Sequence, residues 1–175
     1  MIDQNTVQII EDDPKRTFDG KVIYPHLLTP GIHKISLNKL EETLLVPFED
    51  KRTRTYLCNR FRVLFEELKS YKVEMIIWID GSICSIKPHP SDIDMVIFLN
   101  ENDLSDLPSN LYDKLLSLLE NRDEIRARYG CDLYYEKMSD DKQRHYWRSI
   151  FSYNQLLEVK GFIQLRVSPH EHLYS

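Results

Sequence analysis

Hydrophobic and polar residues recur along this chain with the periods of both helices and strands. Between residues 51 and 70 the apolar side chains are spaced by one, three and four positions, as on one buried face of a helix. This face carries Tyr56, Leu57, Phe61, Leu64, Phe65 and Leu68. Similar patterns predict further helices over residues 36–45, 109–120 and 139–153. The charged segment 121–130 continues the helix before it or follows it.

Four other segments have the composition of buried strands. Residues 73–80, 92–99, 131–138 and 161–167 are short and rich in β-branched or aromatic side chains. The resulting order is helices, two adjacent strands, helix, strand, helix, strand. This order predicts an α/β or α+β fold in which helices pack on a small mixed sheet. We expect Ser139 to be the N-cap of the helix that precedes the last strand.

The first 36 residues have a different character from the rest of the chain. Pro14, Gly20, Pro25, Pro30 and Gly31 interrupt them and forbid a long helix. We therefore predict an irregular N-terminal arm over residues 1–36 and a single domain over residues 37–175. The length of 175 residues suits one hydrophobic core rather than two.

Composition and charge exclude several classes of protein. Hydrophobic residues make up 42% of the chain, with 10 Tyr and 7 Phe, so global disorder is not expected. The net charge of -5 argues against a protein that coats nucleic acid by bulk electrostatics. A local basic patch, such as the one around Arg60 in the helix from residue 51, is compatible with that charge.

The cysteines and the N-terminus indicate the compartment. Cys58, Cys84 and Cys131 are far apart and form no C-x-x-C motif, so neither a disulfide framework nor a cysteine zinc site is predicted. No basic region followed by an apolar run begins the chain, and no stretch of about 18 apolar residues occurs. The sequence predicts a cytoplasmic protein with reduced thiols and no membrane partner.

Two aspartates at the start of the second predicted strand are the first candidates for chemistry. Asp92 and Asp94 are one residue apart, so their carboxylates emerge on the same side of the strand. Two such carboxylates repel each other unless a raised pKa, a basic partner, solvent or a divalent metal compensates them. Mg²⁺ prefers oxygen ligands and is commonly completed by substrate phosphates, which fits this pair.

The end of the preceding strand carries candidates for phosphate binding. Gly81 lets a phosphate approach the backbone closely, and the Ser82 hydroxyl can donate a hydrogen bond to it. Pro88 and Pro90 make the segment that leads to Asp92 a rigid loop or a single helical turn. Lys87 in this loop could neutralise a phosphate, or could be an ordinary solvated lysine.

This constellation resembles the signature of the polymerase-β-like nucleotidyltransferase superfamily, in which a strand ends in Gly-Ser and a spacer leads to D-x-D. A longer likeness, over roughly residues 25–167, is to a small bacterial family known only as nucleotidyltransferase-like. It rests on WIDGS at 78–82, K-x-x-P-S-D-I-D at 87–94, CDLYY at 131–135, YWRSIF at 146–151 and then Lys160-Gly161.

The resemblance implies a role for each matching residue. Gly81 and Ser82 would hold the β- and γ-phosphates of a nucleoside triphosphate, with Lys87 beside them. Asp92 and Asp94 would ligate two Mg²⁺ ions, for which Mn²⁺ could substitute. The superfamily has a third carboxylate on a nearby strand. Asp132 is the matching candidate, and Glu136 lies on the same face further along. The implied function is a metal-dependent transfer of a nucleoside monophosphate to a hydroxyl of RNA or tRNA, another nucleotide or a protein.

Structural alternatives stand beside these roles. The D-x-D aspartates could cap a turn at the start of the strand, and Asp132 could be a solvent-exposed strand end. The group of Tyr146, Trp147, Ile150 and Phe151 is expected to belong to the core rather than to a base-stacking platform.

A rival function is a catalytically reduced triphosphate-binding or interaction module, such as a toxin-antitoxin component. It is favoured by the small size of the chain, since only about 40 residues follow Asp132, too few for the helical domain that larger superfamily members carry. A partner protein or a second copy of the chain could then supply the grip on the acceptor.

Overall fold

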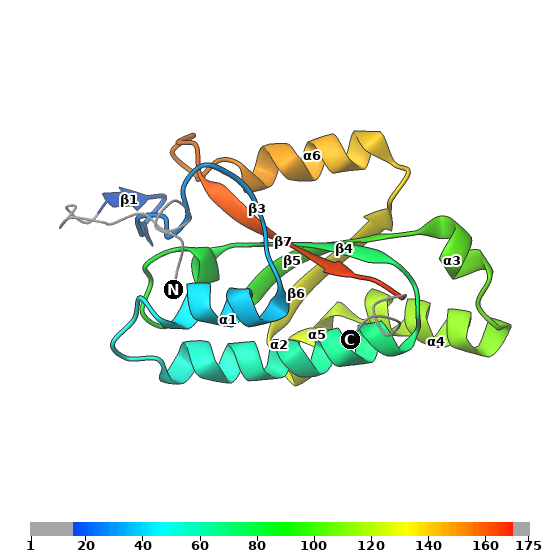
Figure 1. Ribbon diagram of the computed structural model, residues 1–175. Coiled ribbons are helices and arrows are strands. Elements are labelled where there is room, and N and C mark those ends of the chain that lie inside the picture. The colour runs from blue at the N-terminus through cyan, green and yellow to red at the C-terminus, as the bar shows by residue number, and fades with distance from the viewer. Residues whose placement is uncertain (1–15, 170–175) are drawn as a thin grey trace.

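Residues 16–169, which the computed structural model of the chain describes, form an α+β fold around a five-stranded mixed sheet (Figure 1). The strands lie in the order β3 (Gly31–Lys34), β7 (Gly161–Val167), β4 (Met75–Asp80), β5 (Ile93–Leu99) and β6 (Cys131–Lys137). Strand β4 runs antiparallel to both of its neighbours, whereas β3 is parallel to β7 and β6 is parallel to β5. The predicted fold class is confirmed.

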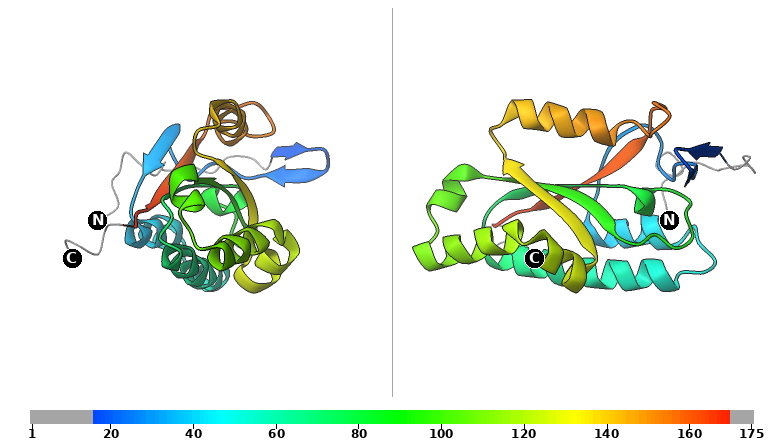
Figure 2. Two further views of the ribbon diagram at one scale, coloured as in Figure 1. Left: turned by 90° about the vertical axis from the view of Figure 1, so that its right-hand side faces the viewer. Right: turned by 180° about the vertical axis from the view of Figure 1, so that it is seen from behind.

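Helices cover both faces of the sheet, but unequally. In Figure 1, α1 (Leu37–Leu45), α2 (Arg52–Ser70), α4 (Ser109–Glu120) and α5 (Arg122–Tyr129) lie below it, and α6 (Asp141–Phe151) lies above it. The short helix α3 (Glu101–Ser105) follows β5 at the right-hand end. The end-on view in Figure 2 shows α6 alone on its side. One face of the sheet is therefore only partly covered by a helix.

The two faces are built from alternate residues of the same strands. Ile77, Ile97 and Leu133 belong to the large core under the helices α1, α2, α4 and α5. Trp78 and Phe98 point to the other face, where they pack with Phe151 of α6 in a smaller aromatic core. Because strand side chains alternate, residues an even number of positions from Trp78 or Phe98 share the α6 face. Asp80 and Asp94 lie on that face, as does Asp132, the register partner of Asp94.

The predicted helices and strands are confirmed with small shifts at their ends. Helix α2 buries the predicted apolar face except for Tyr56, which is 57% exposed. The N-cap of α6 is Asp140, whose side chain accepts a hydrogen bond from the N–H of Gln143, and not Ser139. Ser139 instead donates its hydroxyl to Glu101. The segment 121–130 forms a separate helix, α5, because Asn121 caps its N-terminus.

Part of the predicted irregular arm is regular. Strands β1 (Arg16–Phe18) and β2 (Lys21–Ile23) form a two-stranded antiparallel hairpin, and β3 joins the main sheet beside β7. Between β2 and β3, the N–H of Leu27 donates to Cys84 and the carbonyl of Pro25 accepts from Ile86. The arm from residue 16 onward is thus joined to the segment between β4 and β5. Residues 1–15 of the predicted arm lie outside the described residues.

The helices and the cysteines can be compared with what the sequence predicted about membranes and thiols. Among residues 16–169 no helix combines the length and apolarity needed to cross a bilayer. All three cysteines are buried free thiols. Burial raises the pKa of Cys58 to about 11 and that of Cys131 to about 12, so these thiols are protonated at neutral pH.

Candidate functional site

Three aspartates from three adjacent strands lie side by side on the α6 face of the sheet. Asp94 of β5 is the register partner of Asp80 on β4 and of Asp132 on β6. Directly paired residues point to the same face, and neighbouring strands are about 4.8 Å apart. Asp92 lies just before β5, on the same chain as Asp94 and two residues away. The sheet therefore brings the three predicted acids and Asp80 into one region.

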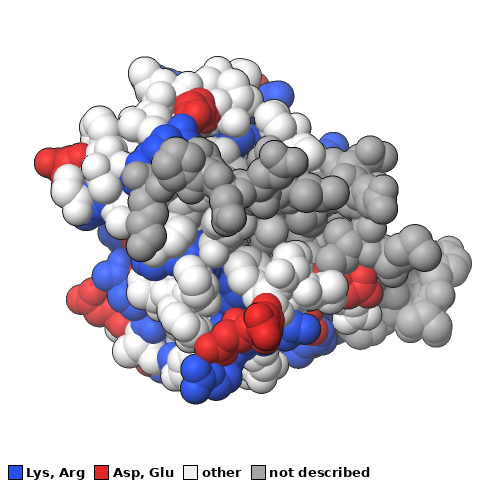
Figure 3. All heavy atoms as spheres, turned by 90° about the vertical axis from the view of Figure 1, so that its left-hand side faces the viewer, with Lys and Arg blue, Asp and Glu red and all other residues white. Residues whose placement is uncertain are grey.

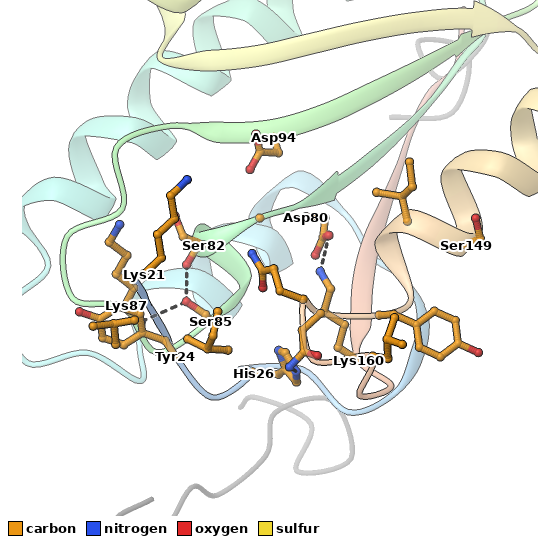
Figure 4. A pocket seen from close by; sticks show the side chains of 18 residues that line it. Lys21, Tyr24, His26, Asp80, Ser82, Ser85, Lys87, Asp94, Ser149 and Lys160 are labelled. Carbon is orange, nitrogen blue, oxygen red and sulfur yellow. Dashed lines mark hydrogen bonds and ion pairs between the residues drawn. The ribbon is translucent and has the colours of Figure 1, made fainter. Parts of the chain in front are cut away.

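A cleft of about 820 Å³ opens beside these acids, a volume within the range that small-molecule ligands occupy. Its wall includes four of the predicted site residues, Gly81, Ser82, Lys87 and Asp94. Asp92 and Asp132 do not line it. Figure 4 shows Lys21 and Lys87 beside Ser82 and Ser85 on one side of the cleft, and Asp80, His26 and Lys160 together on the other.

Gly81 and Asp94 are in direct contact across the junction of β4 and β5. Gly81 has a φ of +84°, which L side chains rarely adopt. A Cβ at this position would overlap the Oδ2 of Asp94 and would lie 2.8 Å from its Cγ. Glycine at position 81 therefore serves two purposes, since it permits the turn into the 3-10 helix at Ser82–Cys84 and makes room for the carboxylate.

The loop that follows Gly81 is held from below by a buried arginine. Arg54 of α2 has no exposed surface, and its guanidinium donates to the carbonyls of Ile83, Ser85 and Lys87 at 2.7–2.8 Å. It also stacks 3.6 Å from the ring centre of Phe48. Burial lowers the pKa of Arg54 to about 10, so it stays charged at neutral pH. The predicted rigid loop is thus fixed by contacts to its main chain.

A buried ion pair forms the floor of the cleft. The ammonium of Lys160, just before β7, donates to Oδ2 of Asp80, and both side chains are at least 90% buried. Burial raises the pKa of Asp80 to about 6, although Lys160 counteracts this rise. The other oxygen, Oδ1, has no hydrogen-bond partner in the described part of the chain. Lys160 brings a positive charge to the same cleft as Asp94.

The carboxylate of Asp94 is destabilised by its surroundings. Burial is the largest cause, followed by the charges of Asp92, Asp132 and Asp80, and together they raise the pKa of Asp94 to about 7. Lys160 acts in the opposite direction. Burial is thus reinforced by the repulsion expected of clustered acids. A divalent cation or a bound group with positive charge would relieve it.

The negative charge of Asp132 is compensated by two arginines of α5. Its Oδ1 accepts a hydrogen bond from Arg122 at 2.5 Å, and its Oδ2 lies 2.9 Å from Arg126. Arg122 also donates to the hydroxyl of Tyr134 at 2.8 Å. The two arginines reach this position because β6 is the edge strand of the sheet and α5 leads directly into it. The carboxylate predicted as the third metal ligand is therefore engaged with arginine.

The donor set fits one Mg²⁺ better than two. In residues 16–169 no group of three or more His, Cys, Asp and Glu side chains is arranged to hold a metal ion. Asp92 and Asp94 nevertheless supply two hard oxygen ligands, and Mg²⁺ is commonly held by one or two carboxylates together with substrate phosphates and water. The raised pKa of Asp94 means that its charged form is destabilised, and a bound cation would stabilise that form. Asp132 could join it only after Arg122 and Arg126 release it.

Several basic residues of α2, in the local basic patch around Arg60, are engaged in contacts within the protein. Arg54 is buried, Arg62 pairs with Glu41 at 2.8 Å, and Arg60 donates to the backbone at the end of α5. Figure 3, which views the left-hand end of the molecule in Figure 1, shows Lys and Arg interspersed with Asp and Glu on the coloured surface. The predicted basic patch is thus largely consumed by internal contacts.

The aromatic residues of α6 also differ from expectation. Phe151 is buried as predicted, whereas Tyr146 is 54% exposed and Ile150 is 42% exposed. Ile150 lines the cleft, and Trp147 contacts Tyr134 of β6. The helix therefore presents part of its apolar face to solvent beside the acids.

Sequence reasoning missed several residues that line the cleft. Lys21 and His26 come from the arm that was expected to be irregular, and no periodicity marks them. His26 has its pKa lowered, chiefly by burial and then by Lys160, so it is neutral at pH 7. Lys160 could have been found, because it belongs to the Lys160-Gly161 string on which the resemblance rests. Asp80 is adjacent to Gly81, and its register with Asp94 follows from the antiparallel pairing.

Fold and site together define an α+β protein with an acid cluster and a lysine-lined cleft on one face of its sheet. A protein-family model matches residues 23–166 and is described as a family of unknown function, DUF6932. The chain belongs to this family. No curated protein matches it, and no solved structure does. The family description names no activity, so the function is argued from the cleft.

Proposed function

We propose that this protein is a Mg²⁺-dependent nucleotidyltransferase that moves a nucleoside monophosphate from a nucleoside triphosphate to a hydroxyl acceptor. The observation that carries the proposal is the contact between Gly81 and the carboxylate of Asp94 at the wall of a nucleotide-sized cleft. A close approach to the backbone suits phosphate, and an uncompensated carboxylate suits the cation that accompanies it.

The residues of the cleft have roles that follow from their chemistry. The triphosphate lies against Gly81 and Ser82, with Lys87 and Lys21 neutralising its charge from the same side. Asp94 and Asp92 hold Mg²⁺, for which Mn²⁺ can substitute. Arg54 is a positioning residue, because it fixes the loop that carries Ser82 and Lys87 without reaching the cleft itself.

The reaction requires the chain mainly to orient the two substrates. The acceptor oxygen forms a bond to the α-phosphorus, the bond from that phosphorus to the bridging oxygen breaks, pyrophosphate leaves, and the hydroxyl proton is released to water. When bound by Asp92 and Asp94, Mg²⁺ would stabilise the negative charge of the triphosphate and of the leaving pyrophosphate. We place this chemistry in the cytoplasm, where triphosphates and Mg²⁺ are available.

The pairing of Asp132 with two arginines favours a second candidate function, a module that binds triphosphate without transferring a nucleotide. With Asp132 paired to Arg122 and Arg126, the cleft keeps its phosphate-facing residues but has one acid fewer for a second metal ion. The two candidates share the triphosphate site and differ in chemistry. They are therefore separated by measuring binding and transfer on the same protein.

Binding is tested by thermal unfolding with each nucleoside triphosphate and Mg²⁺. A ligand present at 100 times its dissociation constant stabilises the folded state by about 2.7 kcal/mol. The Asp92→Asn/Asp94→Asn double variant should lose the shift produced by Mg²⁺ and triphosphate. Asp113→Asn is the matched control, because Asp113 is an exposed aspartate of α4, outside the cleft. No shift with any triphosphate would contradict both candidates.

Transfer is tested with triphosphates labelled at the α-phosphate, Mg²⁺ and a cell extract that supplies acceptors. A nucleotidyltransferase should label a macromolecule or nucleotide, and Asp92→Asn/Asp94→Asn should not. A thermal shift without labelling would favour the binding module. Labelling that survives in the double variant would show that the proposed acid pair is not the catalytic site.

A further inference from the structure

A second surface adjoins the acid cluster on the outer side of the edge strand β6. It consists of Arg122 and Arg126 of α5, Tyr134 of β6 and Trp147 of α6, and we refer to it as the arginine–tyrosine surface. Tyr134 lies on the same face of β6 as Asp132 and two residues further along. The surface therefore begins where Asp132 meets Asp94, and it extends away from the triphosphate side of the cleft.

The Arg122 guanidinium lies over the ring of Tyr134, a contact that we call the stack, and Trp147 packs against the same ring at a tilt of 44°. The guanidinium carbon of Arg122 lies 3.9 Å from the ring centre of Tyr134, and the rings of Tyr134 and Trp147 are 4.9 Å apart. Tyr134 is 39% exposed, and the side chains of Arg122 and Arg126 are 43% and 53% exposed. A flat cation held on an aromatic ring is thus accessible beside the acid site.

The charged groups around the stack leave several guanidinium N–H donors of Arg122 and Arg126 without a partner in the described part of the chain. Asp132 accepts from one guanidinium nitrogen of Arg122, and Glu136 accepts from the indole N–H of Trp147. Within residues 16–169, Nε and Nη1 of Arg122 have no hydrogen-bond partner, and the guanidinium of Arg126 has no polar partner besides Asp132. Ion pairs with exposed arginines are weak, and phosphate forms stronger bidentate pairs with arginine than a single carboxylate contact does.

We propose that the arginine–tyrosine surface binds the acceptor, and that the acceptor is a single-stranded polynucleotide. A phosphate of the strand pairs with Arg122 and Arg126 in place of Asp132, and a base stacks on the outer face of the Arg122 guanidinium, which Tyr134 holds flat. The role as acceptor rests on the proposed function. A phosphorylated protein would use the two arginines but would have no need of the stack.

The proposal makes Asp132 a competitor of the bound strand. Removing its negative charge, as in Asp132→Asn, should free both arginines and tighten binding of the strand. A merely structural ion pair would give the opposite result, because loss of the pair would loosen α5. This expected gain of affinity separates a binding role from a structural one.

The test uses the full chain and a fluorescein-labelled oligouridine of about ten nucleotides, with binding followed by anisotropy in the absence of triphosphate. Arg122→Gln/Arg126→Gln should weaken binding by about tenfold and lower the slope of log affinity against log salt by about 1. Tyr134→Ala should weaken binding several-fold, Tyr134→Phe should restore it, and Asp132→Asn should tighten it. An oligodeoxyuridine of equal length identifies the preferred sugar.

Arg128→Ala is the matched control. Arg128 is an equally exposed arginine of the same helix, but it pairs with Glu124 and stacks on Tyr129. Its variant should bind the strand as the parent protein does, and circular dichroism establishes that each variant is folded.

The proposal is overturned if neither oligonucleotide binds, or if Arg122→Gln/Arg126→Gln binds as Arg128→Ala does. It is equally overturned if Asp132→Asn weakens binding, or if inorganic polyphosphate competes with the strand equally well in the parent and in Tyr134→Ala. Because binding is measured without triphosphate, a protein that binds the strand but transfers no nucleotide would contradict only the proposed function. Transfer that is unaffected by Arg122→Gln/Arg126→Gln would contradict only the acceptor surface.

Discussion

The carboxylate of Asp94 lies in the space that a side chain at position 81 would otherwise fill. Gly81 ends β4 in a conformation with positive φ, and Asp94 stands opposite that end in the adjacent strand β5. Strand pairing itself therefore juxtaposes a glycine and a carboxylate at the wall of the cleft. Their separation cannot change without disturbing the centre of the sheet.

This contact predicts that Gly81→Ala is destabilising, and that part of the cost depends on Asp94. The positive φ alone costs an L residue about 1–3 kcal/mol, and the overlap with the carboxylate adds to it. In an Asp94→Ala background the overlap is reduced, so Gly81→Ala should cost less there. Urea unfolding of the two single variants and the double variant measures this coupling. Additive effects would show that the two residues do not constrain each other.

The raised pKa of Asp94 predicts a pH-dependent gain in stability for Asp94→Asn when no divalent cation is present. The folded chain keeps the Asp94 proton up to about pH 7, whereas the unfolded chain loses it near 3.8. Between these values the folded state binds more protons, so the stability of the parent falls as pH rises and stays at the lower level above pH 7. Asn has no such dependence. We expect the variant to be more stable by up to about 4 kcal/mol at pH 8 and equal near pH 4.

Urea unfolding in EDTA at a series of pH values checks this expectation. Asp113→Asn serves as the control, because Asp113 is exposed on α4 and its replacement should leave the pH profile unchanged. A stability difference between Asp94→Asn and the parent that is the same at pH 4 and pH 8 would refute the explanation.

The buried pair of Lys160 and Asp80 predicts a strongly destabilising effect of Lys160→Met. Removal of one partner leaves a buried carboxylate without compensation, which typically costs about 3–5 kcal/mol. Protonation of Asp80 relieves this cost, so the variant should lose more stability at pH 8 than at pH 5. The double variant Asp80→Asn/Lys160→Met, which contains no buried charge at these positions, should recover most of the loss. Thermal and urea unfolding at both pH values measure the effect.

The contacts of Arg54 predict that its substitution destabilises the protein much more than substitution of Arg52, two residues away in sequence. Arg54→Met would leave buried carbonyls of the 82–87 loop without donors, at about 1–3 kcal/mol for each unsatisfied group, and should destabilise the fold or the loop. Arg52, with an 85% exposed side chain paired to Asp50, should tolerate Ala with little change. Urea unfolding and triphosphate binding compare the variants. Equal tolerance at both positions would contradict the role given to Arg54.

The sequence predicted the regular elements well because their apolar patterns are long and unambiguous. The helix α4 and the strand β7 have the predicted limits, and α2 and β5 differ by a residue at the start. Strand β3 was missed because it is only four residues long and is surrounded by Pro and Gly, so that its pairing with β7 rather than its own composition makes it a strand. Short edge strands of this kind are determined by tertiary contacts.

The part of the candidate site around Gly81 was predictable, because the residues that suit the chemistry and those that shape the backbone lie in one short segment. The turn at Gly81 and the rigid loop beyond it follow from local residue types, and the structure brings Gly81 and Asp94 together. The partners of charged residues were not predictable, since Arg54, Lys160 and Arg122 find theirs on segments 10 to 80 residues away. Such pairings depend on the three-dimensional arrangement, which hydrophobic periodicity does not encode.

Because Arg54 binds main-chain oxygens, it limits which positions of the 82–87 loop must be conserved among members of this family. Within the loop the guanidinium binds main-chain oxygens, so it imposes no demand on the side chain at position 87. Ile83 and Ser85 are constrained separately, because Ile83 is buried in the core and the Ser85 hydroxyl donates to the carbonyl of Ser82 and accepts from the N–H of Lys87. Among relatives, we therefore expect an invariant arginine at position 54 and variation of the loop concentrated at position 87, where substitution can alter ligand preference without reshaping the loop.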